Sequence, residues 1–256
     1  MLLASNLIAL FRVDQPWTEK HLLPLFDWTT DLAEARAAWE GFLWSPRLYR
    51  PLLITLKTKL LDTVKHYDKL GQHAAQFAAF LTYAALNMGD IYTKREFQEA
   101  WAALPQGGLD ESAQALVHAL EGADEQREDY WANRIRPFWQ HIWPKSLQFG
   151  SKSIAESLAR LSIAARNAFP KALPAVYAWL LPIEHADIVV HLLHESKLAD
   201  RFPEEALRLL DVIIKDQAWP PSELKECLTS ISQKAPELSQ DQRHRRLQEY
   251  LRQQGS

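Results

Sequence analysis

Apolar side chains recur along this chain at spacings of three and four residues, the period of a helix with one buried face. Leu32, Ala35, Trp39 and Phe42 follow this spacing within one segment. The segment 72–88 is apolar almost all round, which predicts a central helix packed on several sides. No run of useful length alternates apolar and polar residues between turn signals, so we expect no sheet. The pattern predicts an all-α protein.

Capping residues and prolines indicate where the predicted helices begin and end. Thr93 precedes a helix over 94–104, and Glu96 three residues later completes a capping box. Thr30 is expected to cap the helix that contains Trp39. The Pro105-Gln-Gly-Gly stretch is expected to form a turn. Further helices are expected near 2–12, 46–70, 112–120, 124–143 with a kink at Pro137, 153–169, 172–182, 185–196, 203–218, 221–234 and 239–253.

The connections between these helices are only a few residues long. Short connections favour antiparallel neighbours, so the helices are expected to stack as hairpins in a HEAT-like solenoid or an irregular helical bundle. No fixed repeat of side-chain identity supports a particular repeat family. We expect a single domain over 1–256, with a possible subdomain seam near 148–153.

The chain is poor in glycine and rich in tryptophan, and both facts bear on its function. The chain has 8 Gly, 14 Pro and 10 Trp among 256 residues. Phosphate-cradling loops and nucleophile elbows depend on glycine, and neither G-x-x-x-x-G-K nor G-x-S-x-G occurs. Most tryptophans are expected in the core, with one or two as anchors for a partner. The set considered is Trp28, Trp39, Trp44, Trp101, Trp131, Trp139, Trp143, Trp179 and Trp219.

Charge and cysteine content set further bounds. The formal net charge is −3 and the sequence pI is about 6.3, so nothing global favours nucleic acid. The single cysteine, Cys227, has no internal disulfide partner and is expected to be a reduced thiol on a helix. The first twelve residues are apolar but lack a basic leader, and no window is long enough to span a membrane. These features predict a cytoplasmic protein with no membrane contact.

Three histidines within residues 185–194 are the metal-ligand candidates. His191 and His194 share one helix face at a spacing of three, with His185 and several carboxylates nearby. A zinc enzyme of the H-E-x-x-H type has a spacing of four with a glutamate between. We therefore interpret these histidines as part of a partly solvated helix surface, and we expect no cofactor and no catalytic residue in this chain.

Two basic stretches are candidates for binding phosphates. Arg243, Arg245 and Arg246 cluster near the C-terminus. Cations also outnumber acids over one predicted helix, namely Arg47, Arg50, Lys57, Lys59, Lys65 and Lys69. Nearby aromatic side chains offer stacking platforms for single-stranded bases. The alternative is that these cations rim a buried helix, with their stems lying over apolar neighbours.

One part of the chain resembles a known family. It carries Trp39-Glu-Gly-Phe-Leu-Trp-Ser-Pro-Arg-Leu-Tyr-Arg-Pro-Leu-Leu and then His66-Tyr-Asp-Lys-Leu-Gly-Gln-His-Ala-Ala-Gln-Phe. Over about residues 30–100 it is similar to helical domains at the C-terminus of bacterial sirtuin-like proteins, several of which act in anti-phage defence. The resemblance implies a separate NAD-consuming domain, because this chain has no dinucleotide-binding glycine motif. It also implies that this helical region senses a phage component or controls assembly.

Three hypotheses follow for the function. The first is a non-catalytic interaction, sensor or oligomerisation module that binds a protein or a sirtuin-like domain. The second is a nucleic-acid-binding helical domain that uses the basic stretches. The third is an enzyme with a spatially assembled histidine and carboxylate site around His185–His194.

Overall fold

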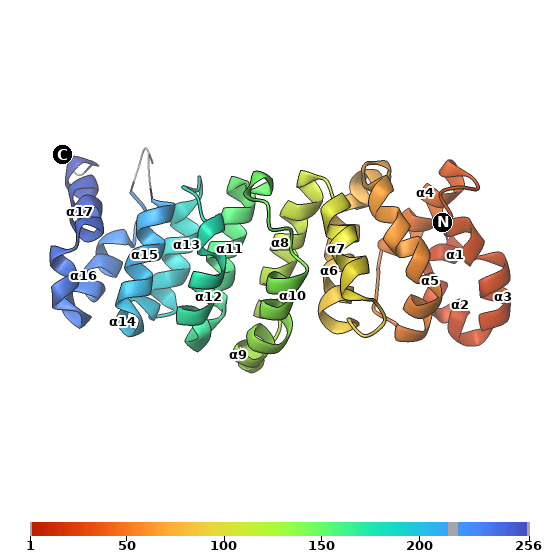
Figure 1. Cartoon of the computed structure of the whole chain (residues 1–256), viewed down its shortest axis with the longest axis horizontal. Helices are drawn as coiled ribbons and strands as arrows, with labels where there is room; N and C mark the ends of the chain where they lie inside the picture. The colour runs from red at the N-terminus through yellow and green to blue at the C-terminus, as the bar shows by residue number, and fades with distance from the viewer. Residues whose placement is uncertain (1, 215–219, 255–256) are drawn as a thin grey trace. The chain divides into compact units, whose positions relative to one another are not determined.

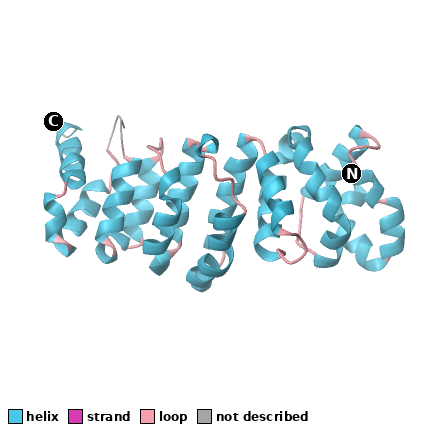
Figure 2. Ribbon diagram, in the orientation of Figure 1, coloured by secondary structure: helices cyan, strands magenta, loops and turns pink. Residues whose placement is uncertain are grey.

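The computed structural model describes residues 2–214 and 220–254, and these contain helices joined by short loops, with no strand (Figure 2). The predicted all-α fold of packed helices is therefore confirmed for this part of the chain. The predicted last turn of the 203–218 helix and the side chain of Trp219 lie outside the described residues. None of the described helices is long and apolar enough to cross a lipid bilayer.

The chain divides into two compact units. Unit 1 contains Met1–Leu116 and Pro137–Ser146, and unit 2 contains Val117–Arg136 and Leu147–Ser256. The division after Ser146 falls just before the seam predicted near 148–153, whereas the single domain over 1–256 stays a prediction.

Unit 1 is built from helices of 4 to 16 residues, labelled in Figure 1. Within it, α1 packs on α4 and α2 packs on α3. A 3₁₀ segment over Val64–His73 packs on α4, α5, α6 and α7. The α-helices are α1 (Leu2–Ser5), α2 (Leu7–Val13), α3 (Gln15–His21), α4 (Leu32–Leu43), α5 (Arg50–Thr63), α6 (Ala74–Asn87), α7 (Lys94–Ala103), α8 (Gln106–Glu121, in unit 1 up to Leu116) and α10 (Arg136–His141, from Pro137).

Unit 2 also consists of short α-helices that pack against one another. Its α11 packs on α12 and α13, while α15 packs on α14, α16 and α17. Short 3₁₀ turns join several of these helices. The α-helices are α9 (Arg127–Tyr130), α11 (Lys152–Ala164), α12 (Phe169–Val176), α13 (Ala186–Glu195), α14 (Leu198–Arg201), α15 (Pro203–Ile213), α16 (Leu224–Lys234) and α17 (Gln242–Gln254).

Side-chain caps explain several helix starts. The Thr93–Glu96 capping box of α7 is present, with both reciprocal hydrogen bonds. The expected cap at Thr30 is wrong by one residue, because the Asp31 carboxylate accepts hydrogen bonds from the backbone N–H groups of Ala33 and Glu34. A carboxylate is favoured at this position because the helix N-terminus carries partial positive charge.

The expected turn at Gly107–Gly108 is wrong. Both glycines lie in the first turn of α8, which begins at Gln106 directly after Pro105. The physical reason is close packing: a Cβ atom on Gly108 would lie 2.9 Å from a side-chain carbon of Leu104 and 3.3 Å from the Tyr67 ring. Glycine is used here for the approach of neighbouring side chains and not for a turn.

The single kinked helix expected over 124–143 is instead a series of short pieces. A π-helical segment, Trp131–Ile135, separates α9 from α10. Pro137 lies two residues after this segment, and its ring lacks an N–H and crowds the carbonyl four residues earlier, which is within the segment. A wider turn before the proline relieves that crowding, which explains why the backbone departs from a regular α-helix here.

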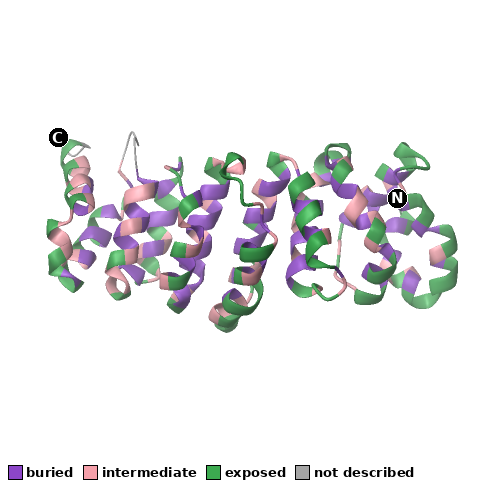
Figure 3. Cartoon of the chain, in the orientation of Figure 1, coloured by how far each residue is buried: buried purple, intermediate pink, exposed green. Residues whose placement is uncertain are grey.

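Aromatic side chains form the centre of unit 1, where Figure 3 shows the buried residues on the inner faces of the helices. The rings of Phe26, Phe42 and Phe77 each meet Trp39 edge to face, at centroid distances of 5.0 to 6.0 Å. Most of the tryptophans expected in the core are buried, whereas Trp44 is 73% exposed. The buried members are Trp28, Trp39, Trp101, Trp131, Trp139, Trp143 and Trp179.

The core of unit 2 is mainly aliphatic, with a few aromatic side chains such as Phe169, and it includes the chain's thiol. Leu158, Phe169, Leu193 and Leu210 are all fully buried. Cys227, on α16, is fully buried too, and burial raises the pKa of its thiol to about 12. At neutral pH this group is a packed, protonated side chain, as a structural cysteine should be.

Candidate functional site

The structure places the histidine candidates on the exposed side of α13. His191 Nδ1 lies 3.1 Å from a carboxylate oxygen of Glu223, which precedes α16. His194 is half-buried near the end of the same helix, and His185 occupies the position before its start. Among residues 2–214 and 220–254, no three His, Cys, Asp or Glu side chains are grouped so that they could hold a metal ion. His191 and Glu223 therefore form a pair that links two helices.

The arginines near the C-terminus are occupied by contacts within unit 2. Arg243 donates hydrogen bonds to Asp241 at 2.7 Å and to Glu204 of α15 at 2.9 Å. Arg246 donates to the Asp211 carboxylate at 2.9 Å and to the Asp211 and Ile214 carbonyls at 2.7 and 3.0 Å.

The third member of that cluster, Arg245, is exposed and donates to the side chain of Gln240. Arg243 and Arg246 thus attach α17 to α15. Any phosphate that bound them would have to compete with carboxylates already in contact.

The ion pair between Asp241 and Arg243 makes stability depend on acid pH. Hydrogen bonding from Arg243 lowers the pKa of Asp241 from 3.8 to about 2. A carboxyl group whose pKa is lowered in the folded state stabilises the fold, and the full effect is present when the pH is above the ordinary pKa of 3.8. This stabilisation is lost as the pH falls towards 2. We expect unit 2 to lose about 1 kcal/mol over this interval from Asp241, since the pair is partly solvated.

Urea unfolding at several pH values between about 6 and 2 measures this loss. Asp241→Asn removes the titrating group and should flatten that part of the curve. An identical pH dependence in the wild type and in Asp241→Asn would contradict the assignment.

Most of the cations expected as a basic stretch over residues 47–69 are also neutralised. Arg50 pairs with Asp90, and Lys57 pairs with Glu96. Lys65 pairs with Asp62 of its own turn at 2.9 Å. The remaining paired cation, Lys59, lies 2.8 Å from Asp27 and holds the pKa of that carboxyl well below its usual range. Among the described residues, Arg47 and Lys69 are the two members of the set without an ion pair.

Exposed apolar side chains gather in the first helices of unit 1. Of the eleven large apolar side chains that are exposed among the described residues, eight lie between residues 2 and 54. Leu2 and Leu3 on α1 are 83% and 53% exposed. Single exposed apolar residues are ordinary, whereas exposed apolar side chains that share one place mark an interaction site. The eight are Leu2, Leu3, Val13, Trp17, Leu25, Leu32, Trp44 and Ile54.

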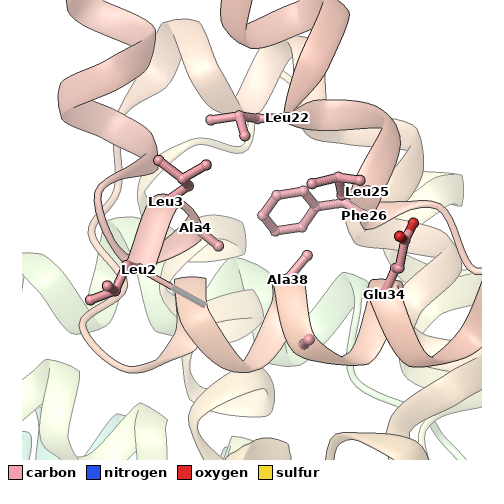
Figure 4. A pocket seen from close by; sticks show the side chains of 9 residues that line it. Leu2, Leu3, Ala4, Leu22, Leu25, Phe26, Glu34 and Ala38 are labelled. Carbon is pink, nitrogen blue, oxygen red and sulfur yellow. The ribbon is translucent and has the colours of Figure 1, made fainter.

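Three of the eight, Leu2, Leu3 and Leu25, line a pocket of about 610 Å³, which we call the apolar pocket. Figure 4 shows Leu3, Ala4, Phe26 and Ala38 around it, with Glu34 beside Leu25 and Phe26. It forms because α1 packs on α4 beside the small side chains of α4. The lining residues are Leu2, Leu3, Ala4, Leu22, Leu25, Phe26, Glu34, Ala37 and Ala38.

Glu34 is the one charged residue that lines the apolar pocket, and it is exposed. It makes no ion pair with any described residue. A carboxylate beside an apolar pocket favours a ligand that combines apolar groups with a cation.

The sequence did not reveal the apolar pocket. The segment 2–12 reads as one apolar helix, whereas the structure breaks it at Asn6 into α1 and α2. Leu25 lies in the short 3₁₀ segment Leu23–Phe26 and belongs to no periodic apolar stripe. Leu32, which the spacing placed on one face with Ala35, Trp39 and Phe42, is 51% exposed at the first position of α4, so that part of the prediction is wrong.

Comparison with known proteins finds a distant, partial relative. Over 134 residues, half of this chain, the sequence is 28% identical to the uncharacterized protein y4cA of Sinorhizobium fredii. The aligned part covers 11% of that much longer protein. No family model matches the chain. No solved structure matches it either.

Proposed function

We propose that this chain is a non-catalytic helical interaction module that binds a protein partner through the apolar pocket. The observation that carries the proposal is a pocket of about 610 Å³ in unit 1 that the exposed side chains of Leu2, Leu3 and Leu25 line. Apolar surface left in contact with water is unfavourable, and covering it by association contributes favourable free energy.

The chemistry of the apolar pocket defines the partner that would fit it. Leu2, Leu3 and Leu25 offer flexible aliphatic surface, which suits leucine or phenylalanine side chains from one face of a helix. The unpaired carboxylate of Glu34 favours a lysine or arginine beside that face. The partner is therefore a helix with an apolar face flanked by a basic residue.

The resemblance of residues 30–100 to the C-terminal domains of sirtuin-like defence proteins supplies a candidate. In that setting the NAD-consuming domain is the partner, and a phage component is the trigger that alters the contact. The much longer relative from Sinorhizobium fredii is consistent with a helical region that works beside other domains.

Sedimentation velocity tests the proposal. The chain is mixed with the separately produced NAD-consuming domain of a sirtuin-like protein of the resembled family, and the formation of a heterocomplex is expected. Leu25→Glu should weaken that association at least about tenfold, because it puts a carboxylate against apolar surface that the partner covers.

Leu147→Glu is the matched control, since Leu147 is an exposed leucine of unit 2, remote from the apolar pocket in sequence. It should leave the association unchanged. Failure of the wild-type chain to associate would argue against the proposal, as would equal association of Leu25→Glu and the wild type.

A further inference from the structure

The arginines of unit 1 fall into two groups. Three of them have carboxylate partners: Arg36 with Glu40, Arg50 with Asp90 and Arg95 with Glu99, at 2.5 to 2.7 Å. The other two, Arg12 and Arg47, make no ion pair with any described residue. Both are exposed to solvent.

Both unpaired arginines line the same pocket. Arg12 lies in the last turn of α2, and Arg47 lies in the loop between α4 and α5. The pocket has a volume of about 300 Å³, and no acidic residue lines it. We call it the arginine pocket, and besides these two it includes Ile8, Phe42 and Ser45. The fold therefore concentrates two positive charges where no carboxylate of the pocket offsets them.

The remaining lining residues favour a ligand with an organic body. Ser45 is exposed, and its hydroxyl makes no hydrogen bond with the described residues, so it is available as a donor. Ile8 and Ala9 line the same pocket and supply apolar surface that is open to solvent. Arginine is well suited to phosphate because its planar group donates two parallel hydrogen bonds to phosphate oxygens.

We propose that the arginine pocket binds a phosphate monoester of a small organic molecule. Arg12 and Arg47 contact the phosphate oxygens, and Ser45 donates a further hydrogen bond. The organic group lies against Ile8 and Ala9. This ligand matches both halves of the lining: a dianion for the two cations and an apolar body for the aliphatic surface.

Isothermal titration calorimetry with phenyl phosphate and with inorganic phosphate tests the proposal. Phenyl phosphate should bind saturably at one site, about threefold or more tighter than inorganic phosphate, because its ring covers apolar surface. Raising the salt concentration should weaken both affinities, since the pocket is open to solvent. Arg12→Gln and Arg47→Gln should each weaken phenyl phosphate binding at least about tenfold, because each removes a charge-assisted contact.

Two controls separate this site from general charge and from the apolar pocket. Arg95→Gln removes an exposed arginine of the same unit that pairs with Glu99, and it should leave the affinity unchanged. Leu25→Glu, which alters the apolar pocket, should also leave the affinity for phenyl phosphate unchanged. The phosphate site and the proposed protein contact are therefore tested independently of each other. Circular dichroism should report the same fold for both glutamine variants, because Arg12 and Arg47 are exposed.

Three results would overturn the proposal. One is the absence of saturable phenyl phosphate binding to the wild-type chain. Another is wild-type affinity in both Arg12→Gln and Arg47→Gln. The third is inorganic phosphate binding as tightly as phenyl phosphate, which would show that the organic group does not contribute to binding.

Discussion

Replacing Trp39 with alanine is expected to lower the free energy of unfolding of unit 1 by about 3–5 kcal/mol. Trp39 is fully buried and contacts the rings of Phe26, Phe42 and Phe77. Its indole N–H also donates a hydrogen bond of 3.2 Å to the Phe26 carbonyl. The substitution removes a large apolar surface, leaves a cavity among three aromatic rings and deprives a buried carbonyl of its donor.

Trp44→Ala is the matched control, because the two tryptophans are five residues apart and differ in burial. Trp44 is 73% exposed and directly follows α4. Its replacement should change stability by less than about 0.5 kcal/mol. Urea unfolding followed by circular dichroism measures both variants. Equal losses in Trp39→Ala and Trp44→Ala would contradict the placement of α4.

The second large effect is expected from Arg246→Ala, which should destabilise the attachment of α17 by about 1–2 kcal/mol. Arg246 donates to a carboxylate and to two carbonyls around the end of α15, Asp211 and Ile214. Alanine leaves all three acceptors without this donor. Arg246→Lys should recover only part of the loss, because a single ammonium group lacks the flat fork of donors that reaches several oxygens together.

Hydrogen exchange measures this effect locally. The backbone amides of α17 should exchange faster in Arg246→Ala, whereas those of α11 should keep their protection. Arg245→Ala is the neighbouring control: Arg245 is exposed and contacts Gln240 of the preceding turn, so its loss should not change protection in α17. Unchanged exchange in Arg246→Ala would show that other contacts hold the helix in place.

How much of the fold the sequence predicts depends on whether a feature is local. The Thr93–Glu96 capping box is a local pattern, and it was predicted correctly. The apolar face of Leu32, Ala35, Trp39 and Phe42 was likewise predicted from spacing: the last three side chains are buried, whereas Leu32, at the first position of the helix, is exposed. Gly107 and Gly108 were misjudged because their role depends on Leu104 and Tyr67, whose approach to Gly108 is not visible in the chain order.

The candidate sites show the same limit more strongly. Arg12 and Arg47 are 35 positions apart, and nothing in their spacing indicates a common pocket. Arg243 and Arg246 form a conspicuous basic cluster in the sequence, but their partners Glu204 and Asp211 come from another helix. Counting charges along the chain cannot separate an occupied arginine from a free one, because ion pairing depends on which helices become neighbours.

The burial of Cys227 has a practical consequence for all of these experiments. Because the native thiol is enclosed and protonated at neutral pH, a maleimide dye should leave it unmodified while the protein is folded. A cysteine introduced at Leu147 or Trp44 would then be the single reactive position. Fluorescent or spin labels can be attached there without first removing a core residue.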